Sequence, residues 1–305
     1  MASWIRALVS RTRKNDSAGA DRSTDPESSP RLDPSGIIGA LIIVAVVIAA
    51  IAAPLVAPHD PNAQDLMGRL KPPGWQSPLS GARFLLGTDQ LGRDVLSRII
   101  YGARISLFVG ILSVAITAAL GTLLGLIAGY YRGIAEAIVM RGVDLVLSLP
   151  FMLLALAVIG ITGPGIQNLI LVVVLTRWAR YTRVIYGQVL SYSEREFVEA
   201  ARVIGTSSLR IMFQHLLPNL LPTTIVLATL DLGFVIVLES GLSFLGLGVP
   251  PTIPTWGTML ADGRAYLNNA WWMGTFPGLA IMLTVLGFNL LGDWVRDRMD
   301  PTLRI

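Results

Sequence analysis

The sequence contains no cysteine among its 305 residues and only two histidines. Without cysteine the chain has no disulfides, no thiol catalysis and no thiolate metal site. The two imidazoles are those of His59 and His215, and no cluster of Asp, Glu or His surrounds either of them in the sequence. The composition therefore predicts that this chain holds no metal.

Lysine is almost absent, since Lys14 and Lys71 are the only two. A Walker A loop requires Gly-x-x-x-x-Gly-Lys followed by Ser or Thr, and neither lysine lies in such a loop. Any ATP site of that kind must therefore lie on another chain. An intramembrane enzyme would need a nucleophile with a base, or a metal, and the sequence shows neither pattern. We predict that the chain is not an enzyme.

Charge is scarce, because 14% of the residues are charged, whereas 53% are hydrophobic. The apolar residues gather in long runs, and a helix needs about 20 of them to cross a bilayer core. The strands of a membrane barrel would alternate polar and apolar residues, which these runs do not. The sequence thus predicts an all-α integral membrane protein with six transmembrane helices. They come from the runs 36–57, 105–131, 145–176 (divided in two by the Gly/Pro turn at 160–168), 220–247 and 271–291.

The basic residues indicate an orientation for these helices. If the N-terminus is cytoplasmic, 14 Arg and Lys residues fall in inside segments and 7 in outside segments. This bias predicts a multi-pass protein of the bacterial plasma (inner) membrane with both termini cytoplasmic. The net charge of +4 is then a sign of orientation and not of nucleic-acid binding. The run from Gly36 is too long for a signal-peptide core and is expected to be an uncleaved anchor.

Five regions follow from this topology. We expect a largely disordered cytoplasmic tail, within which residues 1–14 form either an amphipathic helix on the inner leaflet or a frayed basic end. The regions are a tail at 1–35, a first span at 36–57, an extracytoplasmic segment with an amphipathic helix at 58–104, a core of five spans at 105–292 with a cytoplasmic loop at 191–219, and a cytoplasmic C-terminal tail at 293–305.

The stretch "LGTDQLGRDVLSRIIYGARISL" at 86–107 ends the extracytoplasmic segment. Apolar residues recur in it every four positions, which predicts a helix that leads into the second span along the membrane surface. Thr88 and Asp89 are candidate N-caps. The helix is either interfacial without a partner or a docking surface for an external protein. The candidate docking residues are Asp89, Arg93, Asp94 and Arg98.

Ionisable residues interrupt the predicted fourth and fifth spans. Arg177, Arg180 and Arg183 are spaced three apart, as in a voltage sensor, but the short apolar run before them favours a packing or interface role. Asp231 and Glu239 lie about 80° apart around a helix and can share one broad face. Because a carboxylate at mid-bilayer is unfavourable alone, they either line a polar path or pair with the arginines. The candidate path-lining or intramembrane polar residues are Arg180, Arg183, Asp231 and Glu239.

The charged stretch at 193–219 predicts two short helices joined at a glycine. Ser193 is the candidate N-cap of the first, with Glu196 completing a capping box, and Gly205 is expected to end it in the left-handed conformation. Pro218 is expected to mark entry to the next span. The hairpin is either a docking element for another protein or a self-packed loop. One face of its first helix is predicted to hold Phe197, Ala200, Ala201 and Ile204.

Part of this stretch, "EAARVIGTSSLRIMFQHLLP" at 199–218, resembles the EAA signature of membrane subunits of binding-protein-dependent ABC importers. His215 occupies a position that is usually aliphatic. The chain is also similar to the C-type permease of dipeptide and oligopeptide importers. This similarity lies in the stretch at 86–107 and in "ESGLSFLGLGVPP", "TWGTMLADGR" and "FNLLGDWVRDRMDP", so that the resemblance covers most of residues 35–301. The signature positions that fit are Glu199, Ala200, Ala201, Gly205, Leu217 and Pro218.

The resemblance implies a type I ABC importer permease fold, with a five-helix core and an N-terminal span. It also implies a heterodimer with a second homologous permease, one or two P-loop ATPase subunits that bind ATP and Mg, an extracytoplasmic substrate-binding protein, and contact with membrane lipid but no nucleic acid. No cofactor is implied in this chain. The implied cargo is a dipeptide or oligopeptide, with nickel chelates or haem as alternatives. The alternative to an importer subunit is a self-sufficient secondary transporter.

In the family that it resembles, the helix of the EAA signature is seated in a cleft of the ATPase. Carried over by position, Glu199 would bond to the ATPase, Phe197 and Ala200 would pack into its groove, and Gly205 would permit the turn. ATP binding would then switch the spans between inward-open and outward-open states. The residues implied in this coupling are Phe197, Glu199, Ala200, Ala201, Arg202 and Gly205.

Overall fold

The computed structural model describes residues 34–299, apart from residue 79. The predictions for the N-terminal tail, including the amphipathic helix within 1–14, and for the last residues of the C-terminal tail therefore lie outside the described residues.

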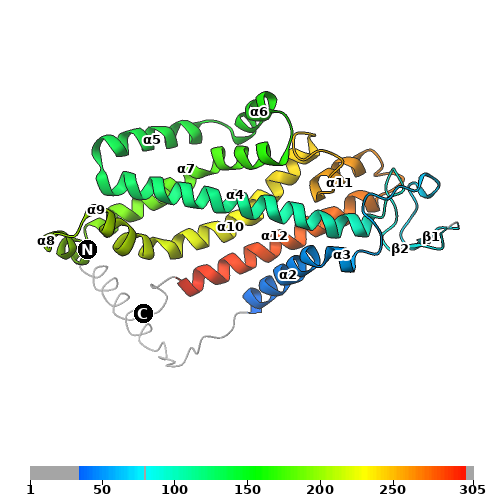
Figure 1. The fold of residues 1–305 in the computed structure, drawn as a ribbon, viewed down its shortest axis with the longest axis horizontal. Coiled ribbons are helices and arrows are strands. Elements are labelled where there is room, and N and C mark those ends of the chain that lie inside the picture. The colour runs from blue at the N-terminus through cyan, green and yellow to red at the C-terminus, as the bar shows by residue number, and fades with distance from the viewer. Residues whose placement is uncertain (1–33, 79, 300–305) are drawn as a thin grey trace, which may run out of the picture. The chain divides into compact units, whose positions relative to one another are not determined.

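Nearly all the regular secondary structure in the described part of the chain is helical (Figure 1). One small antiparallel hairpin, β1 with β2, departs from the predicted all-α fold and places Trp75 opposite Phe84. We call the end of the helices near β1, β2 and α11 the hairpin end, and the end near α8 the loop end. The elements are α2 (Pro34–Ile51), α3 (Ala53–Val56), η1 (Leu66–Gly68), β1 (Trp75–Gln76), β2 (Arg83–Phe84), α4 (Val95–Tyr131), α5 (Gly133–Ser148), α6 (Phe151–Thr162), α7 (Ile166–Ser193), α8 (Glu196–Val203), α9 (Ser208–Arg210), η2 (Ile211–Leu216), α10 (Leu217–Phe244), α11 (Trp256–Arg264) and α12 (Trp272–Met299).

Four helices in the described residues are long and apolar enough to cross a membrane: α2, α4, the continuous helix Ser208–Phe244 and α12. The bent pair of α5 and α6 makes a fifth if it is one span. The structure therefore supports an all-helical membrane protein with four or five candidate spans. By composition α7 is not among them, because Arg177, Arg180 and Arg183 interrupt its apolar run.

Pro150 produces the sharpest change of direction within the predicted third span. The sequence predicts a kink here, and the structure has a complete break, with α5 and α6 meeting at 95°. Proline lacks the N–H that a continuous helix would use, and it disfavours helical backbone at the residue before it. Leu149 is accordingly extended, with φ −90° and ψ 134°.

The predicted amphipathic helix on the membrane surface is not a separate element. α4 runs without interruption for 37 residues, about 55 Å, from Val95 through the second span. Leu91 precedes its first turn, and the N-cap is Asp94, whose carboxylate accepts a hydrogen bond from the Ser97 backbone at 2.9 Å. The prediction of Thr88 or Asp89 as N-cap was wrong, because these residues form the turn that leads into the helix.

Three glycines spaced four apart let α4 and α7 lie against each other (Figure 1). A Cβ on Gly125 would lie 2.8 Å from the Thr182 carbonyl oxygen and 2.9 Å from the Ile185 Cβ, and one on Gly129 would lie 2.7 Å from the Val189 Cβ. Small residues at this spacing allow helices in a membrane to approach closely. Gly121, Gly125 and Gly129 thus form the groove of α4 that α7 fills.

Replacing Gly125 with valine should force α4 and α7 apart. Overpacking of this kind destabilises a protein by about 1–3 kcal/mol, and we expect a lower thermal unfolding midpoint for the detergent-solubilised protein. Ala119→Val is the matched control, because Ala119 is exposed on the same helix. Equal midpoints for the two variants would show that the groove does not need glycine at this position.

Candidate functional site

The loop between α7 and α10 begins later than the sequence suggests. Ser193 is the last residue of α7 and is buried, so it is helical and does not have the extended backbone of an N-cap. The N-cap of α8 is Arg195, whose side chain makes no capping bond. The predicted capping box of Ser193 and Glu196 was therefore wrong, because α7 continues through its first member.

The end of α8 agrees with the sequence. Gly205 has a φ of +78°, in the left-handed region that glycine enters without steric cost. Its N–H donates to the Arg202 carbonyl at 3.0 Å, and the Thr206 N–H donates to the Ala201 carbonyl at 3.0 Å. This pair of bonds is a Schellman motif, which closes the helix and redirects the chain.

The two faces of α8 differ in their contacts. Val198 and Ala201 are buried in a hydrophobic cluster with residues of α4, α7, η2 and α10, including Leu126, Ile185 and Leu216. This cluster fixes the inner face of α8 to α4, α7 and α10. The next helix is also joined to the loop, because α9, η2 and α10 form one continuous helix from Ser208 to Phe244.

The outer side of the loop carries exposed apolar side chains. Of the four residues predicted to share a face, only Ala201 faces inward, whereas Phe197 is 39% exposed and Ile204 is 80% exposed. Glu199 and Arg202 are exposed as well, and the Arg202 guanidinium lies over the Tyr130 ring at 5.5 Å. Exposed apolar groups next to charged ones are typical of a docking surface. The exposed apolar side chains of the loop are Phe197, Ala200, Val203, Ile204, Leu209 and Phe213.

A second group of polar residues joins α7 to α10 midway along both helices. Asp231 is 3% exposed, forms an ion pair with Arg177, and accepts a hydrogen bond from the Tyr181 hydroxyl at 3.3 Å. Arg180 Nη1 lies 3.9 Å from the same carboxylate. The Arg177 guanidinium also lies 4.2 Å from the centre of the Phe234 ring. Asp231 was predicted either to line a polar path or to pair with the arginines of α7, and in the structure it pairs with them.

The other predicted intramembrane residues lie apart from this cluster. Arg183 forms an ion pair with Asp144 of α5. Glu239 is fully buried and accepts hydrogen bonds from the hydroxyls of Ser106 at 3.4 Å and Ser243 at 2.9 Å. Glu239 therefore ties α10 to α4 in the interior and does not pair with the arginines of α7.

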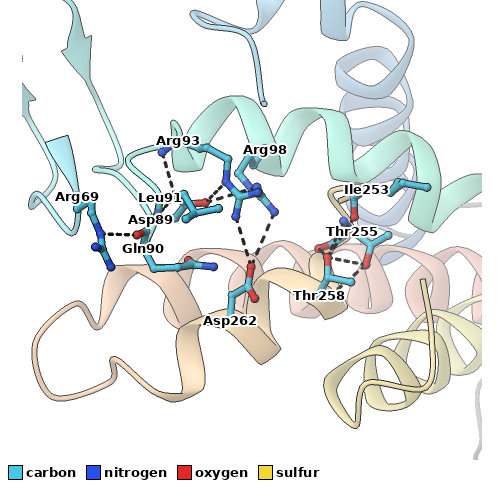
Figure 2. A network of polar contacts seen from close by, with 10 residues as sticks. All are labelled: Arg69, Asp89, Gln90, Leu91, Arg93, Arg98, Ile253, Thr255, Thr258 and Asp262. Atoms are coloured by element: carbon cyan, nitrogen blue, oxygen red, sulfur yellow. Dashed lines mark hydrogen bonds and ion pairs between the residues drawn. The ribbon is translucent and has the colours of Figure 1, made fainter. Parts of the chain in front are cut away.

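At the hairpin end, two arginines alternate with two carboxylates (Figure 2). The Asp89 carboxylate accepts hydrogen bonds from the Leu91 N–H at 2.8 Å and the Arg93 Nε at 2.6 Å. Arg98 Nη1 lies 3.4 Å from the same carboxylate. Asp262 of α11 lies 3.6 Å from Arg93 and 3.9 Å from Arg98. The balanced charges of this network hold the segment before α4 against α11.

The residues predicted to dock an external protein are all buried in this region. Asp89, Arg93, Asp94 and Arg98 are each at most 6% exposed, and all four form hydrogen bonds or ion pairs within the chain. A docking surface needs exposed side chains, so burial gives these four a structural role. Docking of a partner on the segment that they hold stays a prediction.

Sequence reasoning missed four residues that contribute to these sites. Asp262 and Tyr181 carry no local signal, because their partners are distant along the chain. Thr255 and Thr258 form a capping box at the start of α11, with their hydroxyls bonded to each other's backbone N–H at 3.1 and 3.0 Å (Figure 2). The spacing Thr-x-x-Thr could have indicated this helix start, although the box usually ends in Glu or Gln.

Comparison with known families gives two matches. Residues 121–305 match the binding-protein-dependent transport system inner membrane component, and residues 31–73 match the N-terminal transmembrane domain of oligopeptide transport permease C.

Individual proteins are similar over most of the chain. The di/tripeptide transport system permease protein DppC of Pseudomonas aeruginosa is 46% identical over 87% of this chain and 88% of its own. The dipeptide permease DppC of Haemophilus influenzae is 41% identical over 88% and 90%. The probable D,D-dipeptide permease DdpC of Escherichia coli is 41% identical over 88% of each chain. Among solved structures, the methionine ABC transporter MetNI matches in fold, with a TM-score of 0.54, 22% identity, and coverage of 67% of this chain and 97% of the other.

Proposed function

This chain belongs to the family of binding-protein-dependent transport system inner membrane components, and we propose that it forms one half of the translocation path of an importer for dipeptides and tripeptides. It is the non-catalytic permease subunit of an ABC transporter, a multi-pass membrane protein that works with an ATPase and a substrate-binding protein. The substrate is inferred from relatives named for di/tripeptides, dipeptides and D,D-dipeptides. These names favour peptides over nickel chelates or haem.

The two-sided α8 is the observation that carries the proposal. Its inner face is fixed in a hydrophobic cluster, while Phe197, Val203 and Ile204 remain exposed beside Glu199. A loop that packed only on itself would bury these apolar groups. We therefore place the ATPase on this surface, with Phe197 and Ala200 in its groove and Glu199 bonded to it.

The continuous helix Ser208–Phe244 supports a route from the ATPase into the membrane. A displacement of α8 is transmitted through the cluster to α4 and α7, and along this helix towards Glu239. Close-packed elements move as units, because packed interfaces shift between discrete arrangements. ATP binding by the partner thus switches the helices between inward-open and outward-open states.

The same proposal assigns six spans and a topology. α7 is 28 residues, or about 42 Å, long and packs along α4, which supports its crossing the membrane despite its arginines. The bent pair of α5 and α6 counts as one span. Six crossings and the bias of basic residues support the bacterial inner membrane with the loop end and both termini in the cytoplasm. The segment at 58–94 then faces outward, where the binding protein docks.

Co-purification from the native host is the experiment that tests this function. The tagged chain is extracted in mild detergent, and the proteins that accompany it are identified by mass spectrometry. We expect a second permease chain and P-loop ATPase chains in stoichiometric amounts, and peptide import by the reconstituted complex that requires ATP and a binding protein. A chain that purifies alone and transports without ATP would identify a secondary transporter instead.

A further inference from the structure

We propose that Arg180 meets the carboxylate of the peptide in the translocation path, and this proposal rests on the function proposed above. The cluster between α7 and α10 holds more positive than negative charge. Two cations, Arg177 and Arg180, share one anion, Asp231. Within the described residues no other acid lies within 4 Å of either arginine, so the cluster carries one excess positive charge.

The excess charge resides on Arg180. Arg177 binds the Asp231 carboxylate through Nη2 and through Nε at 3.4 Å, and its side chain is only 14% exposed. The Tyr181 hydroxyl also donates a hydrogen bond to the Asp231 carboxylate at 3.3 Å. Arg180 lies at the edge of this cluster. Its Nη1 is 3.9 Å from the Asp231 carboxylate, and 54% of its side chain is exposed. Its guanidinium therefore keeps donors that no group in the described part of the chain engages closely.

The depth of Arg180 restricts what can lie against it. It is about 20 Å from either end of α7, which is near the middle of the proposed span. A guanidinium in contact with lipid at this depth is strongly unfavourable, so charged residues there face a bundle interior or a water-filled cavity. The exposed side of Arg180 thus faces the path and not the lipid. Arg183, one turn further, has its own partner in Asp144 and adds no excess charge.

A carboxylate is the group that fits this position. Every dipeptide and tripeptide has a C-terminal carboxylate whatever its side chains, so one fixed cation can meet all of them. The planar guanidinium offers paired donors that match a carboxylate. The Asp231 carboxylate lies 3.9 Å from Arg180, and it can pair with the Arg180 guanidinium again when the peptide leaves. This arrangement favours passage over tight binding.

The test compares a free peptide with its amide. The complete transporter, with its second permease, ATPase and binding protein, is reconstituted in liposomes and supplied with labelled Ala-Ala or Ala-Ala-amide. Each peptide is used at a concentration that saturates the binding protein. We expect wild type to import the amide about tenfold more slowly, since a charge-assisted bond is lost. Arg180→Gln should slow Ala-Ala by about the same factor and slow the amide less than about twofold, as expected for groups that act through one contact.

Two further variants sharpen the comparison. Arg180→Lys keeps the charge and should restore most of the import of Ala-Ala. Arg183→Gln is the matched control, because Arg183 is also about half exposed but is paired with Asp144, and it should leave the ratio of the two peptides unchanged.

Several results would overturn the proposal. An equal loss for both peptides in Arg180→Gln would mean a structural role, and unchanged import would mean that Arg180 does not meet the peptide. Loss of the second permease from the Arg180→Gln complex would mean that this charge pairs across the subunit interface. A wild-type complex that imports neither peptide would overturn the proposed function as well, which distinguishes that failure from the others.

Discussion

Gly205→Pro is expected to stop ATP-driven import by the reconstituted complex while the chain still inserts in the membrane. Proline holds φ near −65°, whereas Gly205 has a φ of +78°, and proline removes the N–H that bonds to Arg202. The penalty is about 3 kcal/mol or more, which corresponds to about a hundredfold loss of the native loop conformation. The loop then no longer presents Phe197 and Ile204 in their native positions. The measurement is the rate of peptide import alongside the rate of ATP hydrolysis.

Two further variants distinguish the effect of the turn at Gly205 from the effect of the exposed surface of α8. Gly205→Asn should retain import within about twofold, because asparagine tolerates the left-handed conformation. Glu199→Lys leaves the buried face of α8 untouched, since Glu199 is exposed, and should uncouple ATP hydrolysis from import. Import at the wild-type rate in Gly205→Pro or in Glu199→Lys would remove the basis for coupling through this loop.

Asp231→Ala is expected to destabilise the chain strongly. It leaves Arg177, which is largely buried, and Arg180 without their shared anion, and it removes the acceptor of Tyr181. Breaking a buried ion pair by removing one partner is unfavourable by about 3–5 kcal/mol. We expect a reduced amount of protein in the membrane and a lower unfolding midpoint for what remains.

The double variant Arg177→Met with Asp231→Leu tests whether the unpaired buried charge causes the loss of stability. Because it removes both buried charges, it should recover more than half of the lost stability. Asp293→Ala is the control for loss of an acid, since Asp293 is exposed on α12, and it should stay within about 0.5 kcal/mol of wild type. A double variant no better than Asp231→Ala would mean that packing, and not the unpaired charge, accounts for the loss.

The sequence predicted those features that depend on neighbouring residues. The left-handed turn at Gly205 and the change of direction at Pro150 each follow from the backbone of one residue, and both are present, the second as a complete break and not the predicted kink. The apolar runs located the helices, because burial in a bilayer core requires long uncharged segments. Even α7, with its three arginines, is a helix, although its composition leaves it outside the candidate spans.

Features that depend on distant partners were predicted poorly. Asp89 and Arg98 look like surface charges until Asp262 of α11 is placed beside them, and that contact depends on the whole fold. The inner face of α8 was misassigned for a related reason. A short helix with apolar residues on two sides has two possible orientations, and the position of Val198 against the cluster decides between them.

The pairing of Arg177 with Asp231 also has a consequence for the biosynthesis of the chain. The two residues are 54 positions apart, so at about 5–20 residues per second the ribosome makes the arginine roughly 3–10 s before its counter-ion. During that interval α7 can pack against α4, α5 and α6, and Arg183 has Asp144 as its partner, but Arg177 and Arg180 have no counter-ion. Helix α7 is therefore expected to settle in the bilayer only after α10 has been translated, and ribosome-bound chains that stop before residue 231 should fail to hold α7 across the membrane.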